Sequence, residues 1–338
     1  MRKKKNYMLL GVIIILGGLI AFHIYKNAMS DTEAAHGNLG IFTDKEMDEM
    51  FDKHFSMLQM DVLSDYSLGE VEECVGLEIG GILCREEDIY VVDSAEHRLL
   101  ALDAQGGISN IIGSVGNGPL EFLNPSGIAE HEGQIYILDA GNRRIQVLDS
   151  DLRYEKEIKF PEHIDAGIKN VNSIAVDGNG NIFISCAGIG YSQILCYRYA
   201  DGSFVELGEN FYGTVAGYDG EVYAINIGMA VGENKRKASG WRSGANYLYS
   251  VTTDSMQRIC ELPYGISVLG FVVIRDGLVC MSGGYGTVDF YGLDGEYKHS
   301  FAQKEEIKMM GALDTDECGN IYIGLPEAEN MYKIEKME

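Results

Sequence analysis

The stretch that decides the fold is Gly113-Ser-Val-Gly-Asn-Gly-Pro-Leu-Glu-Phe-Leu-Asn-Pro-Ser-Gly-Ile-Ala129, followed by Gln134-Ile-Tyr-Ile-Leu-Asp-Ala-Gly-Asn-Arg-Arg-Ile-Gln-Val-Leu-Asp149. Its second half contains two short runs rich in Ile, Val, Leu and Tyr, a composition typical of strands. Ala-Gly-Asn-Arg separates these runs and marks a turn. The stretch therefore predicts a small antiparallel β unit.

The same pattern recurs along the chain at a period in the forties. Ile89-Tyr-Val-Val-Asp93 aligns with Ile135-Tyr-Ile-Leu-Asp139 at an offset of 46 residues, and the following Arg and Asp keep the same offset. A fixed period of this length is typical of a β-propeller, whereas a β-sandwich would not repeat Arg and Asp at one offset. Weaker copies begin at Ile182, Val222, Leu278 and Ile321. Six copies predict six blades.

The region from residue 113 to residue 149 closely resembles an NHL repeat, the unit that forms one blade in a family of β-propellers. The resemblance is good in the preceding copy and weaker in the other four. It implies that two Asp–Arg pairs are repeated structural elements that lock neighbouring strands: Asp93 with Arg98, and Asp139 with Arg144. His97 takes a position where the family often has Asn-His-Arg, so we expect it to be structural too.

Each copy predicts four short strands separated by turns. Turn signals that favour a positive φ are Asp177-Gly-Asn-Gly180, Asp219-Gly220, Asp276-Gly277, Asp294-Gly295 and Cys318-Gly-Asn320. Small residues recur on the predicted innermost strands, where strands that converge on a central axis leave little room. These residues are Gly81, Gly127, Ser173, Ala216, Gly270 and Gly311.

The last copy is incomplete. The C-terminus supplies three strands, at Ala312 to Thr315, Ile321 to Gly324 and Met331 to Lys336. The fourth must come from the N-terminal side, between Phe55 and Val75. Such closure pairs sheet edges that an open ring would expose. We therefore predict an all-β fold, a six-bladed β-propeller of four-stranded antiparallel blades with an N-terminal strand closing the last blade.

The N-terminus predicts a membrane anchor. Arg2-Lys-Lys-Lys5 precedes an apolar run from Tyr7 to Tyr25, close to the ~20 residues that a spanning helix needs. Residues 1–6 are then a cytoplasmic basic segment and 7–25 a transmembrane signal anchor, with the propeller outside the cytoplasm. A cleaved signal peptide is the alternative, although its apolar region is normally about 7 to 15 residues. Thr32-Glu-Ala34 is a poor cleavage site, and no Cys follows the run to accept a lipid.

Residues 26–54 predict a linker to a propeller that spans 55–338. Between Ile41 and Met57 the sequence favours a short amphipathic helix packed on the propeller, with binding to a partner as the alternative. Its apolar positions recur at helical spacing: Met47, Met50, Phe51, Phe55 and Leu58.

The charge of the outer domain excludes one class of partner. After residue 26 the chain keeps 22 Lys and Arg against all 51 Asp and Glu, a net charge of −29. Nucleic acid demands a basic surface, so we expect no nucleic-acid partner. The charge suits solubility and permits a cationic partner.

The cysteines form no motif. No Cys-x-x-Cys occurs among Cys74, Cys84, Cys186, Cys196, Cys260, Cys280 and Cys318, and most fall within predicted strands. We expect most to be buried as small hydrophobic residues, with one disulfide as the alternative.

Some proteins with this type of propeller are enzymes, among them peptidyl-amidoglycolate lyases, streptogramin lyases and the strictosidine synthase and lactonase-like group. The lyases use a metal with histidine ligands or a catalytic histidine. No three histidines of the outer domain share inner-strand positions: they are His36, His54, His97, His131, His163 and His299. We therefore expect no zinc site, no catalytic residues and no cofactor. A central calcium at Asn170 and Asn172 is the alternative.

The loops between second and third strands share one face, which we call the rim. They are 94–97, 140–143, 187–192, 228–246, 282–287 and 324–330. The loop at 228–246 is the longest, and ordered loops beyond ~12 to 15 residues tend to be functional. It carries the only Trp beside a basic cluster, residue types enriched at binding hot spots. The candidate ligand-binding residues are Trp241, Arg242, Arg236, Tyr191 and Tyr285. A solvated insertion is the alternative.

The sequence thus predicts a membrane-anchored extracytoplasmic propeller, in a bacterial cell membrane, that binds a protein, peptide or glycan at its rim. One rival is a metal-dependent lyase or hydrolase with its site in the central funnel. Another is a structural propeller that joins envelope proteins through its acidic sides.

Overall fold

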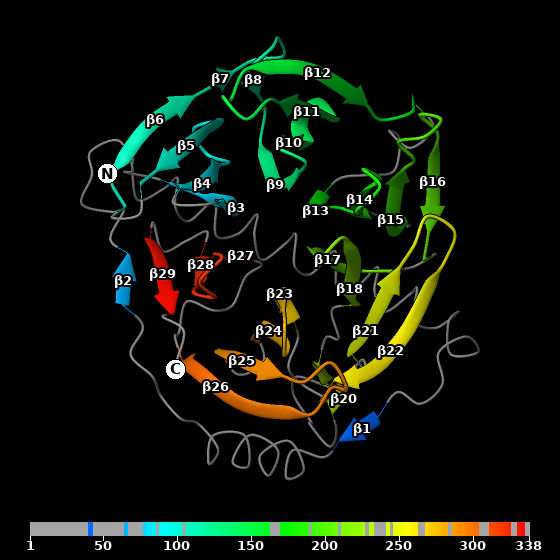
Figure 1. The fold of residues 1–338 in the computed structure, drawn as a ribbon. Helices are drawn as coiled ribbons and strands as arrows, with labels where there is room; N and C mark the ends of the chain where they lie inside the picture. Colours follow the sequence, from blue (N-terminus) through cyan, green and yellow to red (C-terminus); the bar gives the residue numbers. More distant parts are fainter. Residues whose placement is uncertain are drawn as a thin grey trace, which may run out of the picture.

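The computed structural model describes residues 40–42, 64–66, 77–85, 88–103, 106–162, 170–188, 191–208, 211–226, 230–232, 241–243, 246–262, 268–282, 286–303, 311–325 and 330–334. Within these ranges six four-stranded sheets stand around a central axis (Figure 1).

Each sheet is one antiparallel blade. Its strands are given below in their order from the central axis outward. Blade 1 contains β3 (Ile79–Arg85), β4 (Asp88–Asp93), β5 (Arg98–Leu102) and β6 (Ile108–Ile112). Blade 2 contains β9 (Pro125–His131), β10 (Gln134–Asp139), β11 (Arg144–Leu148) and β12 (Tyr154–Lys159). Blade 3 contains β13 (Asn170–Val176), β14 (Ile182–Gly188), β15 (Tyr191–Tyr197) and β16 (Phe204–Leu207).

The second half of the ring repeats this order. Blade 4 contains β17 (Gly213–Tyr218), β18 (Glu221–Asn226), β21 (Asn246–Val251) and β22 (Met256–Leu262). Blade 5 contains β23 (Val268–Ile274), β24 (Gly277–Ser282), β25 (Thr287–Tyr291) and β26 (Tyr297–Gln303). Blade 6 contains β27 (Ala312–Thr315), β28 (Ile321–Leu325), β29 (Asn330–Ile334) and β2 (Ser64–Tyr66). All six repeat starts predicted from the sequence lie on second strands.

The ring closes with a strand from the N-terminal side, as predicted. β2 pairs with β29 in antiparallel register, with Asp65 opposite Tyr332, and forms the outer strand of blade 6. The innermost strands contact one another in order, and β27 of the last blade contacts β3 of the first. Closure therefore joins the two ends of the described propeller.

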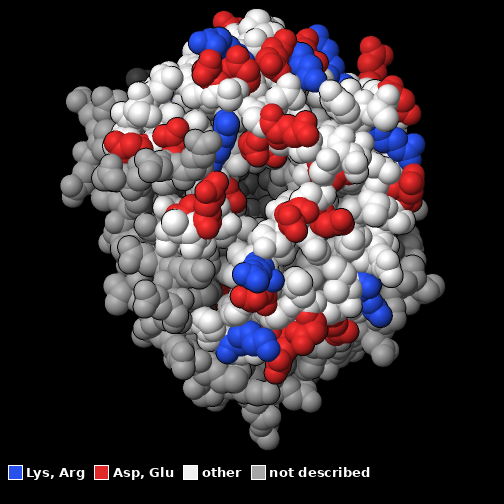
Figure 2. Space-filling view, in the orientation of Figure 1, with Lys and Arg blue, Asp and Glu red and all other residues white. Residues whose placement is uncertain are grey.

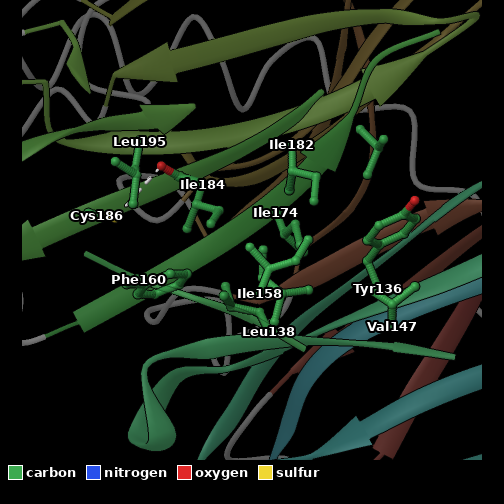
Figure 3. Close-up of a cluster of buried hydrophobic side chains, with 12 residues drawn as sticks. Tyr136, Leu138, Val147, Ile158, Phe160, Ile174, Ile182, Ile184, Cys186 and Leu195 are labelled. Carbon is green, nitrogen blue, oxygen red and sulfur yellow. Dashed lines mark hydrogen bonds between the residues drawn. The ribbon is translucent and has the colours of Figure 1, made fainter. Parts of the chain in front are cut away.

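The hydrophobic core lies between the blades. One cluster of buried side chains occupies each of the six seams between described blades. At the seam between blades 2 and 3, Leu138 and Val147 belong to the same cluster as Ile182 and Ile184 (Figure 3). These aliphatic residues of high β-propensity fill a pleated surface well, and their burial is the main favourable term in folding.

Five of the six small residues expected on the innermost strands lie there, and Gly311 lies one residue before β27. Opposite the fourth residue of each repeat lie Gly81, Gly127, Ser173, Thr214, Gly270 and Ala312. The glycines are needed for close packing between strands: a Cβ on Gly270 would lie 2.5 Å from the carbonyl oxygen of Gly311.

Four of the five expected glycine turns are present. Gly180, Gly220, Gly295 and Gly319 have φ between 74° and 84°, values that L side chains rarely adopt. The fifth turn is shifted by one residue, because Arg275 and Asp276 form the turn and Gly277 begins β24.

The segment before the propeller differs from expectation where it is described. Gly40–Phe42 is a strand, β1, at the position where the amphipathic helix was expected to begin. The rest of that helix and the whole predicted anchor lie outside the described residues. No helix within the described ranges is long and apolar enough to cross a membrane.

Candidate functional site

Arg144 is the centre of a buried clamp. Its Nε lies 2.8 Å from Oδ2 of Asp139, and the two side chains are only 6% and 0% exposed. Its Nη1 donates to the carbonyl of Asn117 at 2.8 Å, and Nη2 donates to those of Gly118 and Glu121 at 2.9 Å. The glycine-rich stretch that decided the fold is thus a loop bound by the Arg144 guanidinium, with further hydrogen bonds from Gln146 to Glu121 and from Asn142 to Gly116.

The first blade contains a simpler version of this clamp. Arg98 Nε lies 2.9 Å from Oδ2 of Asp93, whose other oxygen accepts the N–H groups of Ala95 and Glu96 at 3.2 Å. His97 Nδ1 accepts the N–H of Asn124 at 3.1 Å. All four residues of the two ion pairs, and His97, stabilise turns next to the rim.

Two described segments of the long loop of blade 4 pair as antiparallel strands. β19 (Ala230–Gly232) pairs with β20 (Trp241–Ser243), and β20 pairs on its other side with β1. Trp241 and Arg242 lie on the middle strand of this three-stranded sheet, with Trp241 opposite Phe42 and Gly232. Sequence reasoning missed β1, although Ile41-Phe42 is a short run of strand-forming residues.

The remaining rim candidates are only partly placed. Tyr191 is the first residue of β15 and lies opposite Gly188. Arg236 and Tyr285 lie outside the described residues. Of the five rim candidates, the structure thus places Trp241 and Arg242 on β20 and Tyr191 on β15.

The alternative calcium site would use Asn170 and Asn172. Both lie on β13, where the register shifts between Val171 and Ser173. Among the described residues no three His, Cys, Asp or Glu side chains meet in a way that holds a metal ion.

Among the described cysteines, five are free thiols: Cys186, Cys196, Cys260, Cys280 and Cys318. Burial raises the pKa of Cys186 and Cys196 to about 12, so these thiols stay protonated at neutral pH. A nucleophilic role needs a thiolate in an accessible, electropositive site. These residues are better explained as small hydrophobic side chains in the strands.

A cavity of about 590 Å³ lies on the propeller axis and is lined by all six innermost strands. Ligand pockets commonly measure about 300 to 1,000 Å³. Each inner strand is hydrogen-bonded to a neighbour on one side only, so its other edge presents backbone N–H and C=O groups. The wall is therefore polar even where its side chains are small.

Two inner-edge N–H groups are bonded by side chains of the preceding blade. Ser173 Oγ accepts the N–H of Val215 at 2.8 Å, across the seam between blades 3 and 4. Asp314 Oδ2 accepts the N–H of Cys84 at 2.7 Å, across the seam between blades 6 and 1. Thr214 also lines the cavity; it is 5% exposed, and its hydroxyl has no hydrogen-bond partner among the described residues.

The cavity is strongly acidic. Its lining includes Glu78, Glu130, Glu132, Asp177, Asp219 and Asp314, and none of its described lining residues is Lys or Arg. Asp and Glu side chains border the hollow at the middle of the face that Figure 2 shows. Glu132 and Asp219 belong to turns between first and second strands, so this acidic mouth faces away from the rim.

Some of these carboxylates also hold turns. Asp177 Oδ1 accepts the N–H groups of Asn179 and Asn181 at 2.9 Å. Glu130 Oε1 accepts the N–H of Gly133 at 2.6 Å. Asp314 is different, because burial raises its pKa to about 7. Hydrogen bonds from the N–H groups of Cys84 and Thr315 oppose this rise, and the charge of Asp316 adds to it.

A second pocket of about 270 Å³ adjoins this mouth and shares His131 and Glu132 with it. Tyr136 and Tyr199 also line it, and Tyr199 is 55% exposed with Lys156 Nζ 5.5 Å from its ring centroid. Sequence reasoning considered the central funnel only as the site of a metal-dependent enzyme. It missed Asp314 and the second pocket, since neither Asp314 nor Tyr199 belongs to a recognisable motif.

The fold and its axial cavity define a β-propeller. Residues 37–206 match the DUF5128 family, described as a 6-bladed beta-propeller, and this match spans half of the chain. The chain therefore belongs to that family. No curated protein matches the sequence.

Solved structures share the fold. A gluconolactonase from Xanthomonas campestris is 11% identical, with a TM-score of 0.55 over 76% of this chain and 85% of that one. Hydrazine synthase from Kuenenia stuttgartiensis is 12% identical, with a TM-score of 0.52 over 77% and 96%. A streptogramin B lyase is 13% identical, with a TM-score of 0.51 over 80% and 96%. These similarities concern the propeller architecture.

Proposed function

We propose that this protein is a membrane-anchored, extracytoplasmic propeller of NHL type that binds a protein, peptide or glycan through its rim. The observation that carries the proposal is the sheet formed by β1, β20 and β19. A loop of this length that served only as a solvated connection would not need a second segment of the chain to extend it. Here the Trp and Arg of the loop occupy the central strand.

Two further features support a rim site. The rigid ring holds its loops in fixed relation, which is how scaffolds of this kind present binding residues. Lys235-Arg-Lys237 and Arg242 give the long loop a basic sequence on a strongly acidic domain. Trp and Arg are also the residue types that most often dominate binding energy at interfaces.

The test is partner capture by the full chain. We expect the double variant Trp241→Ala, Arg242→Ala to lose capture of envelope proteins, peptides or glycans that the unaltered chain retains. Tyr199→Ala, an exposed aromatic change outside the rim, should leave capture intact. Thermal unfolding checks that both variants are folded. Unchanged capture by the double variant would contradict a rim site.

A metal-dependent lyase or hydrolase acting in the central cavity is the second candidate. Asp314 favours it, because a carboxyl of raised pKa in a pocket suits general acid–base chemistry. A native mass spectrum of the purified chain tests this candidate. One stoichiometric metal ion that a chelator removes would support the enzyme, and a metal-free mass would count against it.

A further inference from the structure

Asp314 breaks a pattern that the other five blades keep. It lies opposite the second residue of the repeat on its neighbouring strand, Tyr322. The same register position holds Leu83, Ala129, Ala175, Ala216 and Val272 in the other blades. Places where one residue departs from an otherwise consistent pattern are often functional sites.

The departure has a physical cost. A carboxylate that replaces an apolar side chain loses hydration, which disfavours its charged form. The hydrogen bond from the Cys84 N–H offsets part of this loss. A neutral side chain with an oxygen would make the same bond, so ring closure alone does not require a carboxyl group.

The surroundings select the charge of a ligand. Asp314 shares the cavity with five other carboxylic residues and with no Lys or Arg of the described lining. A cavity lined by one sign of charge concentrates the opposite sign, so anions are disfavoured and cations are attracted. A bound cation would also stabilise the ionised form of Asp314.

Two observations separate an organic cation from a metal ion. The described residues bring no three metal-ligating side chains together, whereas a metal ion needs several ligands at short range. The carbonyl oxygens on the polar inner strand edges instead suit a ligand with N–H donors, and Thr214, which lines the same cavity, has a buried hydroxyl without a described partner. The volume of about 590 Å³ accommodates a small organic molecule.

We propose that the central cavity binds a small organic ammonium ion, with Asp314 as its counter-ion and the acidic mouth as its route of access. This site lies away from the rim and does not depend on the proposed rim function. Loss of either function should leave the other unchanged.

Calorimetric titration of the full chain in detergent tests the proposal. The probes are ethylammonium, tyramine and spermidine, with neutral para-ethylphenol and anionic phloretate as matched controls for tyramine. We expect at least one ammonium probe to bind, and tyramine to bind more tightly than its neutral or anionic analogue. No binding of any ammonium probe, or equal binding of para-ethylphenol and tyramine, would overturn the proposal.

Variants assign the binding to Asp314. D314N keeps an oxygen for the Cys84 N–H and removes the charge, so the affinity for the ammonium probe should fall by about tenfold or more. D314A, which matches three of the other blades, should show a similar loss and serves as a second variant if D314N alters the fold. T214V should show a smaller loss, and the exposed control D151N none.

Two outcomes would contradict this assignment. One is unchanged affinity in both D314N and D314A when thermal unfolding shows that they are folded. The other is displacement of the ammonium probe by an equal concentration of calcium, which would point to a metal site instead.

Discussion

Asp314 Oδ2 accepts the backbone N–H of Cys84 at 2.7 Å, so a carboxyl group bridges the last and first blades of the propeller. The closing strand β2 joins blade 6 at its outer edge, and this hydrogen bond joins the same blade to blade 1 at the inner edge. The last blade is therefore completed at its outer edge by β2 and bonded to the first blade at its inner edge by Asp314. The carboxyl group of Asp314 can gain or lose a proton, so the inner hydrogen bond depends on pH.

This titration gives the first prediction. The pKa of Asp314 is raised to about 7, above its unfolded value, because burial disfavours the charged form. The folded state then holds its proton more tightly than the unfolded state. The resulting stability is fully present below the unfolded pKa of about 4 and is lost as pH rises through about 7.

The difference in Tm between the unaltered chain and D314N should therefore fall from pH 5 to pH 8. A decrease of about 2 to 4 °C would correspond to roughly 1 kcal/mol in a protein of this size. Differential scanning calorimetry across this range measures it. Parallel pH profiles of the two proteins would show that Asp314 does not titrate there.

The Arg144 clamp gives the second prediction. Arg144→Met removes the cationic partner of a fully buried Asp139 and a donor from each of three loop carbonyls, although Gln146 Nε2 still donates to that of Glu121. Breaking a buried pair on one side costs about 3 kcal/mol or more. Urea unfolding of R144M measures this loss. Arg153→Met is the control, since Arg153 is 72% exposed and its change should cost less than about 1 kcal/mol; equal losses would contradict the clamp.

Packing between inner strands gives the third prediction. A Cβ on Gly270 would meet the Gly311 oxygen at 2.5 Å, whereas one on Gly217 would have its nearest contact at 3.4 Å. Gly270→Ala should therefore destabilise the fold by about 1 to 3 kcal/mol, the usual cost of overpacking. Gly217→Ala, on another inner strand, should be close to neutral. Chemical denaturation that ranks the two variants in the opposite order would contradict the inter-blade contact.

Ring closure gives the fourth prediction. Asp65→Pro removes an N–H from β2 and prevents regular pairing with β29. We expect a lower Tm and more aggregation, because the outer edge of blade 6 is then exposed. Asp151→Pro, in an exposed turn between β11 and β12, tests whether any proline has this effect. An unchanged Tm in the β2 variant would show that closure contributes little stability.

The sequence predicted the ring well because its signal is repeated. Six copies of one strand pattern define the second strands, and the incomplete last copy requires a closing strand between Phe55 and Val75, where the structure has β2. Periodicity does not specify the register between strands. The sequence therefore did not single out Thr214 and Ala312, which lie opposite the fourth residue of the repeat in blades 4 and 6.

The candidate site was less predictable for a physical reason. Asp314 acquires its raised pKa from a neighbouring blade that is distant in sequence, and no local motif marks it. Strand β1 was missed because its three residues pair with a strand some 200 residues later. The long loop was recognised by length and composition, which identify an insertion but not its secondary structure.

The measurement that tests the proposed function most directly is photo-crosslinking in intact cells. A photoreactive phenylalanine analogue would replace Trp241 on the central strand of the rim sheet and, in a matched variant, Tyr199 beside the second pocket. We predict a discrete crosslinked adduct from position 241 and none of the same mass from position 199. The same adducts from both positions, or none from position 241 in a folded chain, would contradict a rim-binding propeller.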